Sequence, residues 1–438
     1  MSAITLTLPM NKSNKQKNQS GKKSDPRFIE HSHLDKIGEI AVHYGFHPSK
    51  SPEIKKIDLD RAKALLEGDF IDDREHHNHL PLHVEEKISL LRMYEENNMQ
   101  NMTQPVMFYF KDPFKKQSQV ISATLKKLGT SYPRYADLEV IGASKSIAEA
   151  TLIHTARTIL AEEGYKNISV EINSIGDRDS IAKFTRDLTT YYRKNINDMH
   201  AECRQLLKRD PFALLSCTDE KCRKINDDAP KSVTFLTEHS RNHFKEVLEY
   251  LETLGIPYNI NNNLISNRKY CTETIFTIID EDFVTASKNG NSNPHGHRVL
   301  AIGVRYDGLA KKIGLKREVQ GVGLSLLIKG NHADLRKEVK KTKRPQISFV
   351  QLGFESKLLS LGVLELLREA KIPIYQSLAK DRLGAQVSMI EKNHIPYTII
   401  MGQKEALEKC VLVRDTETHA QDSVALCDLA NYMKKLLK

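Results

Sequence analysis

The C-terminal part of the chain constrains the fold most, because short apolar runs typical of strands alternate there with apolar residues at helical spacing. Strands are predicted over residues 347–352, 372–375, 397–401 and 411–414. Helices are predicted over residues 358–367, 383–391 and 420–437. Strands that alternate with helices predict a largely parallel sheet covered by helices. Residues 346–438 are therefore expected to form an α/β domain.

Two basic segments flank the rest of the chain. Residues 336–345 are rich in lysine and arginine and are expected to be a basic linker. Residues 1–30 combine lysine with Asn, Gln and Ser and lack the apolar core of a secretory signal, so a disordered basic tail is expected. The net charge of +10 favours a polyanionic partner such as nucleic acid, since bound lysine and arginine release condensed counterions. A lysine-rich, solubilising surface remains the alternative.

Composition narrows the class of protein further. The 438 residues suffice for two or three domains, and no run approaches the roughly 20 apolar residues of a membrane span. Six cysteines without regular pairing fit a reducing cytoplasm better than a disulfide framework. Cys217 and Cys222 lie five apart, but no second pair of ligands follows at a finger-like distance, so no metal is expected. The histidine-rich residues 69–83 are expected to form an exposed loop.

Two motifs in the middle of the chain point to a family. Residues 264–276 read Leu-Ile-Ser-Asn-Arg-Lys-Tyr-Cys-Thr-Glu-Thr-Ile-Phe, and residues 303–307 read Gly-Val-Arg-Tyr-Asp. In this order and spacing they resemble the histidine-recognition loop and the Gly-Gly-Arg-Tyr-Asp strand of histidyl-tRNA synthetases. The resemblance implies an α+β class II synthetase core, an antiparallel sheet with helices, over residues 31–335, with a helical insertion near 178–240. Residues 346–438 resemble the anticodon-binding domain that this family shares with the prolyl, threonyl and glycyl synthetases.

The resemblance also implies an amino-acid pocket. Glu85 stands at the glutamate that grips the substrate ammonium, and Lys87 replaces a threonine two residues on. Lys87 could pair with Glu85 and neutralise the site; an exposed, salt-bridged helix face is the equal alternative. In the same comparison Tyr135 replaces a glutamine and Cys271 a tyrosine. The implied pocket consists of Glu85, Tyr135, Glu139, Tyr270, Cys271, Arg305 and Tyr306.

The positions implied for catalysis are altered. Lys115, Ser266 and Gly330 stand where the family has three arginine-centred contacts, so no confident catalytic residue is predicted. Lysine lacks the planar fork of arginine, and serine supplies no charge. Losing one preorganised contact of this kind typically costs roughly 10²- to 10³-fold in rate. The implied nucleotide-binding residues are Lys115, Gln117 and Lys329.

The leading hypothesis is a catalytically degenerate paralogue, a pseudoenzyme that binds tRNA or other RNA through its C-terminal domain, linker and tail. A homodimer is implied by the resemblance of residues 44–52 to the dimer-interface motif of the class. One open alternative is an active histidine–tRNA ligase that uses ATP and Mg²⁺, with Lys115, Lys329 and Arg305 on the phosphates. Another is a histidine-sensing regulatory protein, similar to the synthetase-like subunit of ATP phosphoribosyltransferase, although that subunit normally lacks the anticodon domain.

Overall fold

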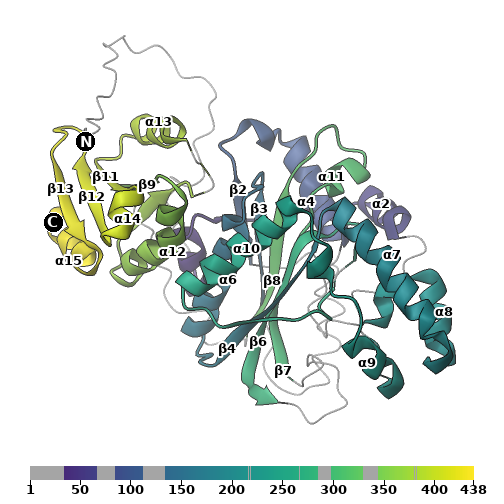
Figure 1. Cartoon of the computed structure of the whole chain (residues 1–438). Helices are drawn as coiled ribbons and strands as arrows, with labels where there is room; N and C mark the ends of the chain where they lie inside the picture. The colour runs from purple at the N-terminus through teal and green to yellow at the C-terminus, as the bar shows by residue number, and fades with distance from the viewer. Residues whose placement is uncertain are drawn as a thin grey trace.

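The structure is a computed structural model (Figure 1). It describes residues 34–66, 84–111, 134–215, 217, 219–265, 267–284, 297–328, 344–378, 380 and 382–438. Several predicted features lie outside these residues: the basic tail, the histidine-rich loop, nearly all of the linker, Lys115, Gln117, Ser266, Lys329 and Gly330. Among the described helices, none is long and apolar enough to cross a membrane.

The larger sheet has eight strands in the order β1-β2-β3-β8-β7-β6-β4-β5. Its strands are β1 His47–Ser49, β2 Val106–Phe110, β3 Arg134–Ile141, β4 Ile168–Gly176, β5 Tyr258–Ile260, β6 Thr272–Val284, β7 His297–Arg305 and β8 Gly321–Ile328. All neighbours from β2 to β4 pair antiparallel, whereas β1 and β5 pair parallel at the two edges. The expected antiparallel sheet with helices is confirmed.

Helices cover both faces of this sheet, because successive strand residues point to opposite sides. Helices α6 (Ile147–Glu162) and α10 (Glu238–Thr253) pack on one face, against residues such as Leu138 and Val170 (Figure 1). Helix α4 (Val84–Glu96) belongs to the apolar cluster of the other face, together with Phe108. The remaining elements of this part are α1 Lys36–His43, α2 Lys56–Leu66, η2 Met99–Asn101 and α11 Leu309–Lys312.

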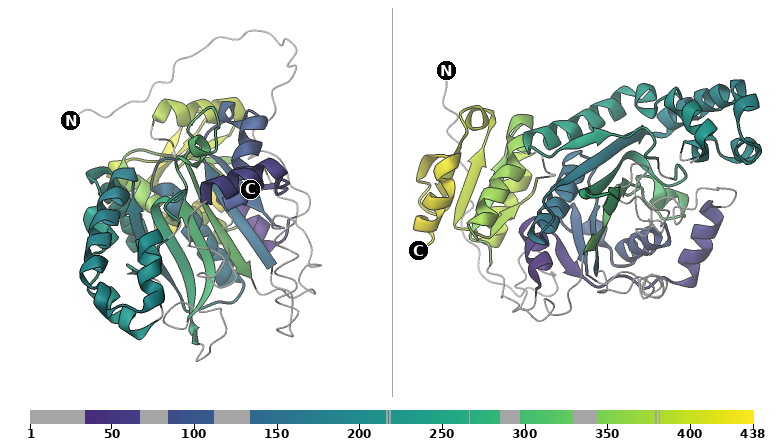
Figure 2. Two further views of the ribbon diagram at one scale, coloured as in Figure 1. Left: turned by 90° about the vertical axis from the view of Figure 1, so that its right-hand side faces the viewer. Right: turned by 90° about the horizontal axis from the view of Figure 1, so that it is seen from below.

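The helices of the insertion project from the end of the sheet that lies away from the C-terminal domain (Figure 2). They are α7 Arg178–Lys194, η3 Ile196–Asp198, α8 Ala201–Arg209, η4 Pro211–Leu214, α9 Glu220–Asp227 and η5 Ser232–Phe235. The Asp177 side chain caps α7 by accepting from the backbone N–H of Ser180 at 2.9 Å. Phe184, Leu188 and Phe212 of these helices are buried in the same apolar cluster as α4 and Phe108.

The C-terminal sheet has five strands in the order β10-β9-β11-β12-β13. The elements are β9 Ile347–Gln351, α12 Phe354–Glu369, β10 Ile374–Gln376, α13 Leu383–Asn393, β11 Tyr397–Met401, α14 Gln403–Leu407, β12 Cys410–Asp415, β13 Gln421–Ala425 and α15 Leu426–Leu436. Parallel pairing is confirmed for β10, β9 and β11, whereas β12 and β13 add as an antiparallel hairpin. The helix predicted over 420–437 was wrong in its first residues. Strand β13 is an edge strand with mostly exposed side chains, so its sequence lacks a strong apolar alternation.

Partly buried polar contacts join the larger sheet's part of the chain to α12 and β10 of the C-terminal domain. The Tyr44 hydroxyl donates to Glu365, and the amide of Gln376 donates to the backbone carbonyl of Tyr44 at 2.9 Å. Arg368 binds Glu365 through two nitrogens, at 2.7 and 3.0 Å. Gly45 has a φ of +93°, and a Cβ there would lie 2.7 Å from Nε2 of Gln376, so the turn requires glycine. The segment implied in dimer formation thus places Tyr44 inside its own chain.

Candidate functional site

A cluster of charged residues lies buried between α4 and strand β3. Glu86 and Lys87 come from the first turn of α4, and Asp137 and Glu139 come from β3. Asp137 and Glu139 are two apart in a strand and therefore share a face. Tyr306, directly after β7, completes the group, and each of the five residues is at most 4% exposed.

Glu139 is satisfied by donors from its own chain. Lys87 forms an ion pair with its Oε1, and the Tyr306 hydroxyl donates to its Oε2 at 2.7 Å. The Lys87 ammonium also lies 5.8 Å from the centroid of the Tyr306 ring. Both carboxylate oxygens of Glu139 thus have an internal partner. Ser325 donates to Asp137 at 2.6 Å, so the second strand carboxylate is also held.

Burial and the excess of acidic groups over cations together shift the pKa values in this cluster. Burial, and then the nearby Asp137, raise the pKa of Glu86 well above its ordinary value. Burial raises the pKa of Asp137 to about 6, against the opposing effects of Lys87 and Ser325. Burial alone would lower the pKa of Lys87, but Glu139 and Asp137 outweigh it and raise the pKa. Lys87 therefore stays charged, whereas burial disfavours the ionised forms of Glu86 and Asp137.

Two glycines of β8 make room for the cluster. A Cβ at Gly323 would lie 2.0 Å from Glu139 Oε2, and a Cβ at Gly321 would lie 2.3 Å from the Tyr306 ring. Gly323 is the register partner of both Glu139 on β3 and Val304 on β7. The close fit of these side chains onto bare backbone explains why glycine occupies both positions.

Arg305 belongs to a different network on the opposite face of the sheet. It binds both oxygens of Glu149 on α6, each at 2.6 Å, and donates to the carbonyl of Ala143 at 2.8 Å. His243 lies 2.8 Å from the same carboxylate. Burial would raise the pKa of Glu149, but Arg305 and His243 lower it to about 2. Arg305 and Tyr306, both predicted for one pocket, therefore have different partners: Arg305 binds Glu149 on α6, whereas Tyr306 binds Glu139 on β3.

The other predicted pocket residues lie around the cluster with different partners. Glu85 is half-buried, and it is Glu86 that enters the buried group; Lys87 pairs with Glu139 rather than with Glu85. Tyr270 and Cys271 are buried in the apolar core beside β6. The backbone of Tyr135 pairs with Leu327 in the sheet.

The loop before β6 is tied to the insertion rather than open. Arg268 forms an ion pair with Asp210, and its guanidinium lies 5.0 Å from the centroid of the Phe212 ring. Lys312 donates to the backbone carbonyl of Lys269 at 2.5 Å. These contacts attach the segment that resembles the histidine-recognition loop to η4 and α11.

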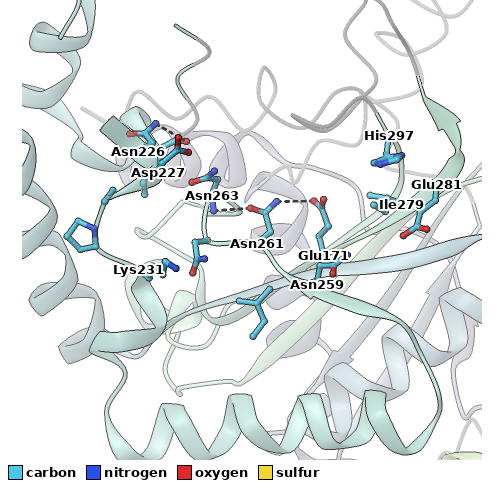
Figure 3. Close-up of a pocket in the computed structure, with 15 residues that line it drawn as sticks. Glu171, Asn226, Asp227, Lys231, Asn259, Asn261, Asn263, Ile279, Glu281 and His297 are labelled. Atoms are coloured by element: carbon cyan, nitrogen blue, oxygen red, sulfur yellow. Dashed lines mark hydrogen bonds between the residues drawn. The ribbon is translucent and has the colours of Figure 1, made fainter. Parts of the chain in front are cut away.

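A polar hollow of about 460 Å³ lies at the other edge of the sheet, beside β5 and the end of α9 (Figure 3). Asn261 donates to Glu171 at 3.1 Å and accepts from the backbone of Asn263 at 3.0 Å. Lys231 and His297 also line it, whereas none of the cluster residues does. Sequence reasoning missed this hollow; the run of asparagines at 259–263 was its available signal.

Known proteins resemble both the C-terminal domain and the chain as a whole. The profile of the Anticodon binding domain family matches residues 346–436. The histidine–tRNA ligase of Bacillus subtilis (strain 168) is 27% identical over 362 residues, which cover 81% of each chain. The histidine–tRNA ligase of Desulforamulus reducens is 24% identical over 408 residues, covering 90% of this chain and 93% of the relative. The crystal structure of apo S. aureus histidyl-tRNA synthetase covers 91% of this chain and 93% of its own, with 21% identity and a TM-score of 0.46.

An antiparallel sheet between helices, followed by an anticodon-binding α/β domain, is the architecture of a class II aminoacyl-tRNA synthetase. Within that class the relatives agree over most of the length of the chain. The chain is thus similar over most of its length to histidine–tRNA ligases.

Proposed function

We propose that this chain is a histidyl-tRNA synthetase-like protein that binds tRNA or related RNA and does not activate histidine efficiently. The observation that carries the proposal is the Lys87–Glu139–Tyr306 contact set, which satisfies the predicted amino-acid pocket from within. Of these three residues, Lys87 is the one that replaces a family threonine.

The cost of displacing Lys87 supports this reading. A substrate that used Glu139 would have to take the carboxylate from a lysine that is 3% exposed. Removing one partner of a buried ion pair typically costs about 3–5 kcal/mol, because the other charge is left uncompensated. The ammonium would also repel the cationic amino group of a substrate. Histidine thus meets both a filled pocket and a like charge.

The nucleotide side of the proposal rests on the sequence. The chain has no arginine at Lys115, Ser266 and Gly330, where the family's arginines would neutralise the ATP phosphates. Gln117 and Lys329 are the remaining polar residues that could bind the nucleotide. Activity would require ATP and Mg²⁺. Two lost contacts of roughly 10²- to 10³-fold each would remove most of the rate, even without strict additivity.

Pyrophosphate exchange with histidine, ATP and Mg²⁺ tests this part, with the Bacillus subtilis ligase assayed alongside. The expected result is no histidine-dependent exchange by this chain and clear exchange by the ligase. Histidine-dependent exchange that disappears in Glu139→Gln would instead establish the alternative, an active ligase with a divergent pocket. The relatives named as histidine–tRNA ligases favour that alternative.

The distribution of charge supports RNA binding. Residues 1–30 carry six basic and two acidic side chains, and residues 336–345 carry six basic and one acidic. Most of the net charge of +10 therefore lies in these two short segments. They adjoin the folded parts on either side, so phosphate contacts of the tail and linker would add to base contacts of the C-terminal domain.

Fluorescence anisotropy at about 0.15 M salt tests RNA binding, with tRNA and an arbitrary RNA duplex as ligands. The expected result is tighter binding of tRNA; equal affinities would contradict the proposal. Glutamine at Lys340, Lys341 and Lys343 should reduce the slope of log K against log salt by about 2 to 3, since each phosphate contact contributes roughly 0.7 to 0.9. The matched control makes the same charge change at three exposed lysines of the folded core, Lys63, Lys183 and Lys245.

We further propose a homodimer that uses the edge of the larger sheet. Strand β1 (His47–Ser49) pairs with β2 on one side and ends the strand order. Residues 44–52, which include this strand, resemble the dimer-interface motif of the class, and that resemblance supports the proposal. Light scattering on the purified protein should give twice the mass of the chain, and a monomer at micromolar concentration would contradict the dimer.

A further inference from the structure

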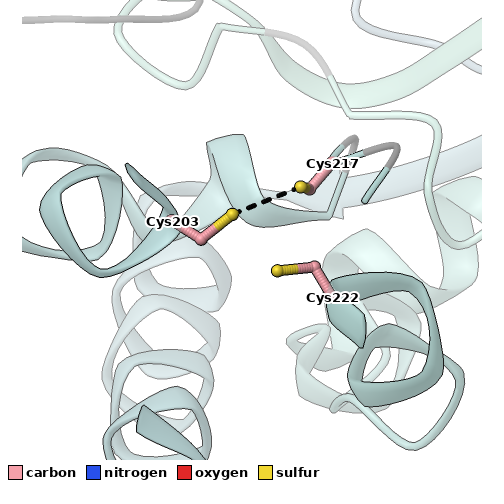
Figure 4. A group of neighbouring side chains, drawn as sticks. All are labelled: Cys203, Cys217 and Cys222. Atoms are coloured by element: carbon pink, nitrogen blue, oxygen red, sulfur yellow. Dashed lines mark hydrogen bonds between the residues drawn. The ribbon is translucent and has the colours of Figure 1, made fainter. Parts of the chain in front are cut away.

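Three cysteines from separate elements of the insertion meet at one point (Figure 4). Cys203 lies on α8, Cys217 follows η4, and Cys222 lies on α9. Their sulfur atoms all lie within 4.8 Å of one another, and the Sγ atoms of Cys203 and Cys217 are 3.4 Å apart. In the sequence only the spacing of Cys217 and Cys222 was visible, so the third thiol was missed.

Two aspartate caps turn the chain so that these thiols meet. Asp210 accepts from the backbone of Phe212 at 3.0 Å and begins η4 directly after α8. Asp219 accepts from the backbone of Cys222 at 3.2 Å and begins α9. The thiols lie inside the resulting bend, where Cys203 is 4% and Cys222 1% exposed. The geometry is thus built by local caps.

The separation of the sulfur atoms fits metal coordination better than a disulfide. A tetrahedral zinc site with Zn–S bonds of about 2.3 Å places its sulfur atoms about 3.8 Å apart. Sulfur contacts between 3.4 and 4.8 Å bracket that value. A disulfide requires about 2.05 Å and would leave one of three thiols without a partner.

We infer that Cys203, Cys217 and Cys222 form a site for a thiophilic divalent cation, zinc above all. Three thiols each lose a proton to solvent, three Zn–S bonds form, and water takes the fourth position. Among the described residues no histidine or carboxylate joins the three sulfur atoms, which leaves that position open. The site would connect α8 to α9 and so stiffen the insertion.

The surroundings of the sulfur atoms predict metal binding that depends on pH. Without a cation, burial raises the pKa of both Cys203 and Cys222, so protons compete with the metal. The backbone amide of His200 contacts the Cys222 sulfur and favours its thiolate. Metal binding is therefore expected to release protons and to weaken as pH falls.

Metal analysis of the full chain, purified under reducing conditions and loaded with zinc before desalting, tests the inference. About one zinc per chain is expected, falling to background in Cys203→Ser and Cys222→Ser. Cys410→Ser and Cys427→Ser, in the C-terminal domain, serve as matched controls and should keep full zinc. Circular dichroism of each variant separates loss of metal from loss of fold.

Cobalt substitution adds a spectroscopic readout of thiolate coordination itself. Thiolate-to-cobalt charge transfer should appear in the wild-type protein and weaken in Cys217→Ser. A folded wild-type protein that retains no zinc and gives no such band would overturn the inference. Thiol alkylation before and after reduction gives a further test. If two of the three thiols reacted only after reduction, the inference would be overturned, because the cluster would then contain a disulfide.

Discussion

Two buried charged groups lie on opposite faces of the same sheet, and they are balanced differently. On the α6 face, Arg305 is matched by Glu149, and the pKa of that carboxyl is held at about 2 despite burial. On the α4 face, the single ammonium of Lys87 meets three carboxyl groups, and the pKa of Asp137 is raised to about 6. The matched network is typical of a structural support, whereas buried groups with shifted pKa values in one cluster are characteristic of functional sites.

The largest expected effect is the loss of the matched network. Arg305→Met leaves Glu149 buried beside His243 without its main cation, which should lower the free energy of unfolding by about 3–5 kcal/mol. Urea unfolding of wild type and variant near pH 7 measures this. A loss below about 1 kcal/mol would show that the network is not the support described.

The next effect distinguishes the two faces by the sign of their pH dependence. Because the pKa of Asp137 rises from 3.8 to about 6, the native state holds more protons than the unfolded state in that window, and stability falls as pH rises through it. Asp137→Asn removes this cost. Relative to wild type, the variant should gain up to about 3 kcal/mol near pH 7 and nothing below about pH 4.

Glu149 has the opposite sign and provides the reference. Its pKa is lowered from 4.5 to about 2, so its stabilising effect is present above 4.5 and is lost as pH falls through that range. Urea unfolding of Asp137→Asn and wild type at several values between about pH 4 and 7 isolates the contribution of Asp137, because Glu149 is present in both proteins. A difference between them that stays constant with pH would contradict the raised pKa of Asp137.

The Lys87→Thr substitution tests whether the acid-rich cluster can bind free histidine once the lysine is removed. Removing the ammonium frees Glu139 and leaves Tyr306 as its donor, so the affinity for free histidine should rise at least about tenfold, or roughly 1.4 kcal/mol. Calorimetry on both proteins measures this, with Lys87→Met as the matched variant that fills the space with an apolar chain. Equal affinities of Lys87→Thr and wild type would show that Lys87 does not block the pocket.

The smallest effect on the free energy of unfolding is expected at an exposed ion pair, which serves as a comparison for the buried ones. Lys224 and Glu220 on α9 lie 3.2 Å apart, with side chains 76% and 85% exposed. Lys224→Gln should change the free energy of unfolding by less than about 0.5 kcal/mol. A loss comparable to that of Arg305→Met would mean that burial does not control these energies.

The sequence was most informative where the signal is local. Apolar spacing located β9, α12, β11 and α13 to within a few residues, and order and spacing of motifs indicated the family. It failed at β13, whose side chains are mostly exposed and therefore carry little apolar pattern. It also grouped Arg305 with Tyr306, and their different partners, Glu149 and Glu139, became known only from the packing of α6 and β3.

Residue type, spacing and motif order were sufficient to derive the class of fold, the family and the altered residues at the pocket. Side-chain partners were not derivable in this way. Lys87 meets Glu139 across 52 positions, and Cys203 joins Cys217 across 14, in each case from separate elements. Such pairs depend on how α4 docks on β3 and how η4 turns between helices, and long-range packing sets both. Lys87 can be read from the sequence, but its ion pair with Glu139 is known only once α4 is packed against β3.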